Sequence, residues 1–200
     1  MTKNENKLPL SRLTLLLCVF VVASPFGCNN ANKEAIDGEQ TSVVERTVDT
    51  ELVELPEQYY LVLRERLPLD NMTGFFGIEA QALVDAANAA GIQALGPVTG
   101  LFYEWNEAEG IGEAAVALPV APGTQLGSYV GITLPRARAF SAKLEGPYTG
   151  LGAVHYGLSA QFEINQVRPG VPTREEYIVG PVDGVGEGDF KTRVLYPIVE

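Results

Sequence analysis

The segment Pro172-Thr-Arg-Glu-Glu-Tyr-Ile-Val-Gly-Pro181 decides how the rest of this chain is interpreted. It predicts a strand, in which residues two apart face the same side, so Glu175 and Tyr177 share one face. A one-residue error in register would exchange Glu175 and Glu176. A carboxylate beside an aromatic ring that lines a cavity suits an apolar or cationic small molecule. The alternative is a half-exposed strand whose two glutamates are solvated.

The pattern of elements around this segment occurs twice. In each half a strand is followed by a helix with apolar residues at helical spacing, and then by two strands. The halves are offset by about 75–80 residues, which is too long for a solenoid repeat and fits a duplicated half-domain. The predicted strands span 59–66, 97–105 and 113–120 in the first half, 128–134 between the halves, and 138–145, 174–179 and 190–198 in the second half.

Two such units predict an α+β fold. We expect duplicated β-α-β-β half-domains with pseudo-twofold symmetry, an antiparallel sheet with two helices on one face, and a central cleft at the seam between the halves. Phe102, Tyr103 and Trp105 hold the place in the first half that Glu175 and Tyr177 hold in the second. The cleft is therefore expected to present aromatic rings from one half and an acid–aromatic pair from the other.

Two further rings begin the predicted helices. Phe76, beside Met72 and Phe75, belongs either to the core or to a lip of the cleft. Tyr148 opens the second helix near the seam, with its ring either in the cleft or in the core. The candidate ligand-binding residues are Glu175, Tyr177, Tyr103, Trp105, Tyr148 and Phe76.

The composition limits the classes of partner that the chain can bind. Its 200 residues, 46% of them hydrophobic, suffice for one domain of ordinary size plus a tail. The formal net charge is −11 and the sequence pI is about 4.6. Such a chain repels phosphate backbones, and it contains no basic patch, so nucleic acid is not expected as a partner.

The N-terminus has the features of a targeting signal. A basic start is followed by a short apolar run at 13–22, which is too short for a spanning helix and fits a signal peptide over residues 1–27. The run ends at Ser24-Pro-Phe-Gly-Cys28, which resembles a bacterial lipoprotein cleavage box and predicts lipidation of Cys28. Cleavage without a lipid and an uncleaved anchor are the alternatives. We expect a flexible tether at 28–50, a domain at 51–200, and no disulfide, because one cysteine would remain.

Few residues can support catalysis or bind a metal. His155 is the only histidine, and its helical spacing favours the edge of the core or the rim of a pocket. No second histidine or available cysteine would complete a metal site, and no Gly-x-Ser-x-Gly turn accompanies a possible triad. The glycines near Gly146 lack the spacing of a phosphate loop. We therefore expect no metal, no cofactor and no dedicated catalytic group.

Residues about 50–200 resemble the GyrI-like small-molecule-binding domain, the effector-binding domain of AraC-type and MerR-type multidrug regulators. The matching segments are 96–103, 118–120, 146–148, 172–177 with Pro181, and 192–198. The resemblance implies a pseudo-twofold α+β fold with a central ligand cleft. There an acidic residue, Glu175 by position, and aromatic neighbours such as Tyr177 contact lipophilic cations. The regulators carry a DNA-binding helical domain where this chain is expected to have its signal peptide and tether.

Three functions follow as hypotheses. The first is non-catalytic binding of a lipophilic small molecule, neutral or cationic, by a domain anchored to the membrane of the bacterial cell envelope through Cys28, with a secreted or periplasmic soluble form as the alternative location. The second is a hydrolase that opens strained electrophilic rings, as some stand-alone members of the family do, with Glu175 as general acid or base. The third is a module for protein interaction in the envelope. The sequence leaves the ligand and the oligomeric state open.

Overall fold

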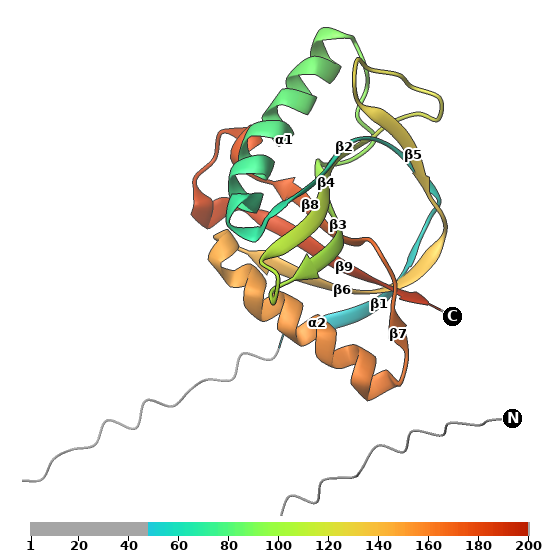
Figure 1. Cartoon of the computed structure of the whole chain (residues 1–200), viewed down its shortest axis with the longest axis vertical. Coiled ribbons are helices and arrows are strands. Elements are labelled where there is room, and N and C mark those ends of the chain that lie inside the picture. Colours follow the sequence, from blue (N-terminus) through green and yellow to red (C-terminus); the bar gives the residue numbers. More distant parts are fainter. Residues whose placement is uncertain (1–47, 200) are drawn as a thin grey trace, which may run out of the picture. The chain divides into compact units, whose positions relative to one another are not determined.

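The computed structural model describes residues 48–199, which form one curled sheet and two helices (Figure 1). The predicted signal peptide, Cys28 and most of the predicted tether lie outside the described residues. The helices are α1 (Met72–Ala89) and α2 (Leu151–Asn165). The strands are β1 (Thr50–Leu55), β2 (Gln58–Pro68), β3 (Thr99–Asn106), β4 (Ile111–Pro119), β5 (Val130–Leu134), β6 (Ala137–Glu145), β7 (Arg168–Pro169), β8 (Thr173–Val179) and β9 (Lys191–Val199).

The sheet confirms the predicted duplication. Its strands follow the order β1-β6-β9-β8-β3-β4-β2-β5, and every pairing is antiparallel. The second half supplies β6-β9-β8 and the first half supplies β3-β4-β2, so the order of one half is the reverse of the other. β8 and β3 pair at the centre. The seam between the half-domains is therefore a continuous part of the sheet.

Both helices cover the same face of the sheet, as the sequence predicts (Figure 1). α1 packs against β4 and α2 packs against β6. Leu83 of α1 and Leu158 of α2 are completely buried, and each is the centre of an apolar cluster between its helix and the sheet. This burial explains the helical spacing of apolar residues in the sequence.

The opposite face of the sheet, here called the inner face, is enclosed by the curl. One apolar cluster on it gathers Tyr60, Val62 and Leu101 from the first half. A smaller one joins Leu55, Ala139 and Leu195, on the side of the second half. β1 and β2 lie near opposite ends of the strand order, yet only Pro56 and Glu57 connect them. Such a short connection requires the sheet to curl.

The element that the sequence indicates least clearly is β1. In the sequence, only a weak alternation of valines suggests that the chain pairs with the domain before residue 53. In the structure, Thr50–Leu55 pairs with β6 along its whole length. The edge strand is partly exposed and carries Glu51 and Glu54. Charged residues are typical of an exposed edge, where they discourage pairing with another chain.

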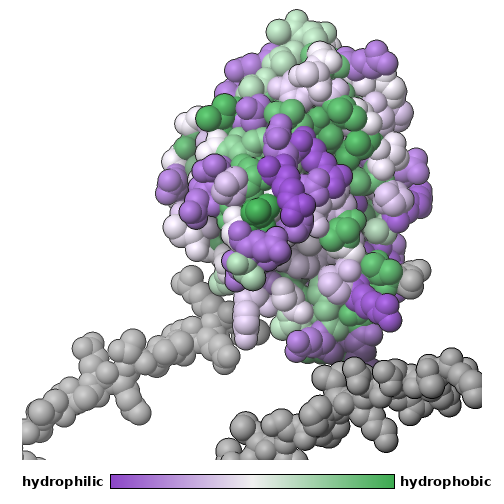
Figure 2. Space-filling view, in the orientation of Figure 1, coloured by the Kyte–Doolittle hydropathy of each residue, from purple (hydrophilic) through white to green (hydrophobic). Residues whose placement is uncertain are grey.

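The hydropathy of the face drawn in Figure 2 marks no single site. On the face drawn in Figure 2, hydrophobic residues form several small patches among hydrophilic ones. Neither helix of the described residues is long and apolar enough to cross a membrane. Buried polar groups therefore indicate the candidate sites better than surface hydropathy does.

Candidate functional site

Glu175 lies at the centre of the seam and faces the helices. On β8 it is opposite Gly100 of β3 on one side and Val194 of β9 on the other. It is only 6% exposed. Glu176, the next residue, points to the inner face and binds Arg193. The structure thereby resolves which of the two glutamates faces the helices.

The glycine opposite Glu175 provides the space for its neighbours. A Cβ atom on Gly100 would lie 2.9 Å from the Tyr177 hydroxyl oxygen and about as close to the rings of Phe102 and Phe76. The distance to the Tyr177 hydroxyl is shorter than real Cβ contacts, and the other two are tighter than most, so a side chain here would displace at least one ring. Gly100 and Glu175 face each other where the two halves meet. One half supplies the carboxylate and the other supplies the room around it.

A chain of hydrogen bonds holds the Glu175 carboxylate. His155 Nε2 of α2 lies 2.7 Å from Oε1, and the Tyr177 hydroxyl donates to Oε2 at 2.8 Å. The other ring nitrogen, His155 Nδ1, lies 2.9 Å from the hydroxyl of Tyr196 on β9. With an ionised carboxylate as acceptor, Nε2 carries the proton, and a neutral imidazole then accepts from Tyr196 through Nδ1. His155 is thus a partner of the acid, a role that its spacing beside Val154 does not reveal.

Aromatic rings surround this carboxylate. The Tyr148 ring packs between Tyr177, with ring centroids 5.5 Å apart, and Phe190, with centroids 4.9 Å apart. Phe76 of α1 lies 6.3 Å from Tyr177 and 5.2 Å from Phe102, again between centroids. Phe76 lies in the first turns of α1, and Tyr148 lies in the short 3-10 helix that precedes α2. The structure therefore brings Phe76, Tyr148 and Tyr177 together around Glu175.

Tyr103 is the candidate that the structure does not bring to Glu175. A β-bulge in β3 shifts its register against β4 between Phe102 and Glu104. Tyr103 packs on the inner face with Leu101, two residues earlier in β3, and there the Arg64 guanidinium carbon lies 3.5 Å from its ring centroid. The expectation that Tyr103 lines the same site as Glu175 placed the adjacent residues Phe102 and Tyr103 on one side, whereas adjacent residues of a strand face opposite sides.

The same bulge turns Trp105 back towards the helix side. Its ring contacts that of Phe102 at a centroid distance of 6.2 Å, and 53% of the residue is exposed. Phe102 in turn contacts Phe76. Trp105 is therefore at the outer end of a row of rings that leads through Phe102 and Phe76 to Tyr177, rather than beside the carboxylate itself.

The environment of the site keeps its tyrosines protonated. Burial raises the pKa of Tyr177 well above its usual value, and the adjacent Glu175 charge adds to this effect. Burial also raises the pKa of Tyr148 to about 12, with further contributions from Glu175 and Asp183. Both phenols are therefore neutral hydrogen-bond donors over the physiological pH range.

The described residues contain no cluster of three or more side chains that could hold a metal ion. The site consists of one carboxylate, one imidazole, phenol hydroxyls and apolar rings. Such a set can bind a ligand through charge and ring faces, or it can transfer a proton.

No protein-family model and no curated protein matches this sequence. Solved structures do share its fold. The C-terminal domain of EcmrR has a TM-score of 0.64 and 19% identity, over 76% of this chain and 98% of that domain. The EcmrR chain in a complex with DNA has a TM-score of 0.67 and 18% identity, over 76% of this chain, which spans only 57% of that longer chain.

Two other solved structures are similar over 76% of this chain. SAV2435 bound to tetraphenylphosphonium has a TM-score of 0.57 and 15% identity, with 94% of that chain covered. A hydrolase from Listeria innocua has a TM-score of 0.52 and 11% identity, with 93% covered. At these identities the likeness establishes the fold, which agrees with the one that the sequence resemblance implies.

The raised pKa of Tyr148 predicts how stability depends on pH. An unfolded tyrosine titrates near pH 10. Between about pH 10 and 12 the unfolded chain releases a proton that folded Tyr148 retains, so this contribution is complete below pH 10 and is lost as the pH rises through that window. We expect Tyr148→Phe to lose less unfolding free energy than the parent protein between pH 9 and 11, measured by urea denaturation.

The control for this measurement is Phe190→Leu, which alters the ring packed against Tyr148 but removes no titratable group. It should lower stability by a similar amount at every pH. An equal or steeper loss of stability in Tyr148→Phe would contradict the assigned pKa.

Proposed function

We propose that this domain binds a lipophilic small molecule, preferentially a cation, at the Glu175 cluster. The observation that carries the proposal is a carboxylate that is 6% exposed and whose hydrogen-bond partners are His155 and Tyr177. Its partners among the described residues include no lysine or arginine. While His155 is neutral, the negative charge of Glu175 is compensated only by hydrogen bonds.

A lipophilic cation would compensate this charge in two ways. It would interact with the carboxylate by charge, and with the faces of rings such as Tyr148, Tyr177 and Phe76 by cation–π attraction, worth about 0.5–2 kcal/mol for each ring. The fold shared with SAV2435, whose structure contains tetraphenylphosphonium, supports this class of ligand without identifying it. A protonated His155 would compete with the cation for Glu175.

The test compares two neighbouring glutamates that face opposite sides of the sheet. We expect tetraphenylphosphonium to bind at pH 8, where histidine is usually neutral, and Glu175→Gln to weaken its binding about tenfold, or ~1.4 kcal/mol. The neutral triphenylphosphine oxide should bind the parent and Glu175→Gln equally. Isothermal titration calorimetry measures both affinities.

Glu176→Gln is the matched control, because it removes the same charge from the same strand on the opposite face. It should leave the affinity for tetraphenylphosphonium unchanged. Equal losses in both variants would point to a general electrostatic effect, and an unchanged affinity in Glu175→Gln would remove this carboxylate from the site.

A second candidate function is hydrolysis of a strained electrophilic ring. The chain from Tyr196 through His155 to Glu175 favours it, because a carboxylate oriented in this way can act as a general base on water. Tyr177 or Tyr148, both neutral, would be the proton donor to the opening ring. The Listeria innocua hydrolase shares the fold, which makes the hypothesis worth testing.

Styrene oxide is a suitable probe for this activity. We expect its conversion to the diol to be at least about 100-fold slower in Glu175→Gln, the usual effect of losing a general base. Nuclear magnetic resonance follows the substrate and the diol. The same diol yield with parent and variant, or no turnover above buffer, would contradict the hydrolase hypothesis and leave the binding proposal standing.

We further propose that the domain is anchored to a membrane of the bacterial envelope by a lipid on Cys28. The support is the basic start, the short apolar run and the Ser24-Pro-Phe-Gly-Cys28 segment. In bacterial cells we expect the parent protein to sediment with membranes and Cys28→Ser to remain in the precursor form without lipid, measured by fractionation and intact mass. A parent protein that carries no lipid would contradict this proposal.

A further inference from the structure

A hollow of about 290 Å³ lies on the inner face of the sheet, on the side away from Glu175. Both halves line it: Tyr60 and Thr99 come from β2 and β3, and Arg174 comes from β8. Arg174 precedes Glu175 in the chain, so alternation along β8 directs it to the opposite face. β8 thus presents polar side chains to two separate regions, one on each face of the sheet.

Arg174 is buried here without a complete set of partners. It is 4% exposed, and it lies between Leu101 of β3 and Leu195 of β9, which are both fully buried. Its Nε is buried and has no hydrogen-bond partner. A buried guanidinium normally uses its donors on a carboxylate or a carbonyl, since an unpaired buried charge is destabilising. The Nε donor is therefore available to an occupant of the hollow.

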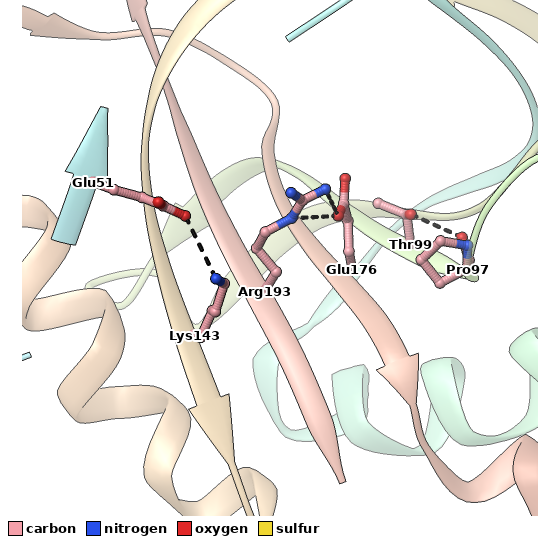
Figure 3. Close-up of polar contacts among 6 residues, drawn as sticks. All are labelled: Glu51, Pro97, Thr99, Lys143, Glu176 and Arg193. Atoms are coloured by element: carbon pink, nitrogen blue, oxygen red, sulfur yellow. Dashed lines mark hydrogen bonds and ion pairs between the residues drawn. The ribbon is translucent and has the colours of Figure 1, made fainter. Parts of the chain in front are cut away.

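The acidic residues around the hollow are already engaged. Glu176, on the same strand and face as Arg174, accepts a hydrogen bond from Arg193 Nε at 2.7 Å and a second one from the same guanidinium. Figure 3 shows Arg193 reaching Glu176 from the neighbouring strand, with Thr99 nearby. Glu54 at the rim lies 3.7 Å from Arg138, and its side chain is 81% exposed. Among residues 48–199, no carboxylate forms an ion pair with Arg174.

Tyr60 adds a neutral donor beside this charge. Burial raises the pKa of Tyr60, whereas the Arg174 charge and a hydrogen bond from the Arg174 guanidinium act in the opposite direction. The phenol therefore keeps its proton at neutral pH, as a free tyrosine does. The guanidinium and the hydroxyl can both donate hydrogen bonds to an occupant of the hollow. Neither group adds a negative charge to the site.

The remaining walls are largely apolar. Leu55, Leu95, Pro97 and Pro119 all line the hollow. Its volume of about 290 Å³ is close to twice the ~150 Å³ cavity that accommodates benzene in another protein. An occupant could therefore have an apolar body the size of a substituted ring and a polar end against Arg174.

We propose that this hollow is a binding site for a small organic carboxylate with an apolar body, which pairs with the Arg174 guanidinium. A planar carboxylate matches the fork of an arginine and takes up the Nε donor that is otherwise unpaired. The net charge of −11 repels anions at long range, so recognition depends on this contact rather than on the field of the whole chain. The site differs from the Glu175 cluster in both location and ligand charge.

The experiment compares benzoate with benzamide, which has a similar shape but no charge. We expect the full chain in mild detergent to bind benzoate at least tenfold more tightly than benzamide, measured by isothermal titration calorimetry. Arg174→Met should abolish this preference, so that the two probes bind equally. The substitution replaces a buried charge by an apolar chain of similar length, which proteins often tolerate without loss of stability.

Leu95→Glu and Leu95→Gln form a second pair that does not disturb the interior, because Leu95 is 56% exposed. The glutamate should weaken benzoate binding about two- to fivefold relative to the glutamine, the usual size of an exposed charge effect. Glu175→Gln, on the other face, should retain the full preference for benzoate. Equal affinity for benzoate and benzamide in the parent, or a retained preference in Arg174→Met, would overturn the proposal, as would equal benzoate affinity in the two Leu95 variants.

Discussion

The pairing of Gly100 with Glu175 at the centre of the β3–β8 seam is the constraint on which the rest of the site depends. A buried carboxylate costs on the order of several kcal/mol unless it is hydrogen-bonded, so it requires donors close by. Those donors are Tyr177 and His155, and the Tyr177 hydroxyl needs the space that a side chain on the opposite residue would occupy. The seam supplies this space because the residue of the first half that faces Glu175 is a glycine.

Alternation along β8 places two sets of polar side chains on opposite faces of the sheet. Glu175 and Tyr177 face the helices, where rings surround the acid. Arg174 and Glu176 face the inner side, where one positive charge is left without a carboxylate. Only the single layer of the sheet lies between the two faces. Groups of opposite charge are therefore adjacent in the chain but contact different surroundings. The two faces of the sheet therefore differ in the sign of the charge that each presents at β8.

His155 connects the site to α2. The imidazole bridges the Glu175 carboxylate and the Tyr196 hydroxyl, and so it joins the helix to two strands of the second half. The same bridge is also what an acid–base mechanism would require, which is why binding and catalysis are distinguished by substrate turnover rather than by geometry.

The sequence by itself determined the α+β class, the duplicated strand–helix–strand–strand order and the buried faces of both helices, because hydrophobic periodicity is a local property of the chain. It also indicated Glu175 and Tyr177 as neighbours on one face. Only the tertiary structure decided that Glu175 rather than Glu176 faces the helices, that a bulge returns Trp105 to the helix side, and that His155 binds Glu175. These features depend on strand register and on contacts between residues far apart in the chain, which local patterns do not encode.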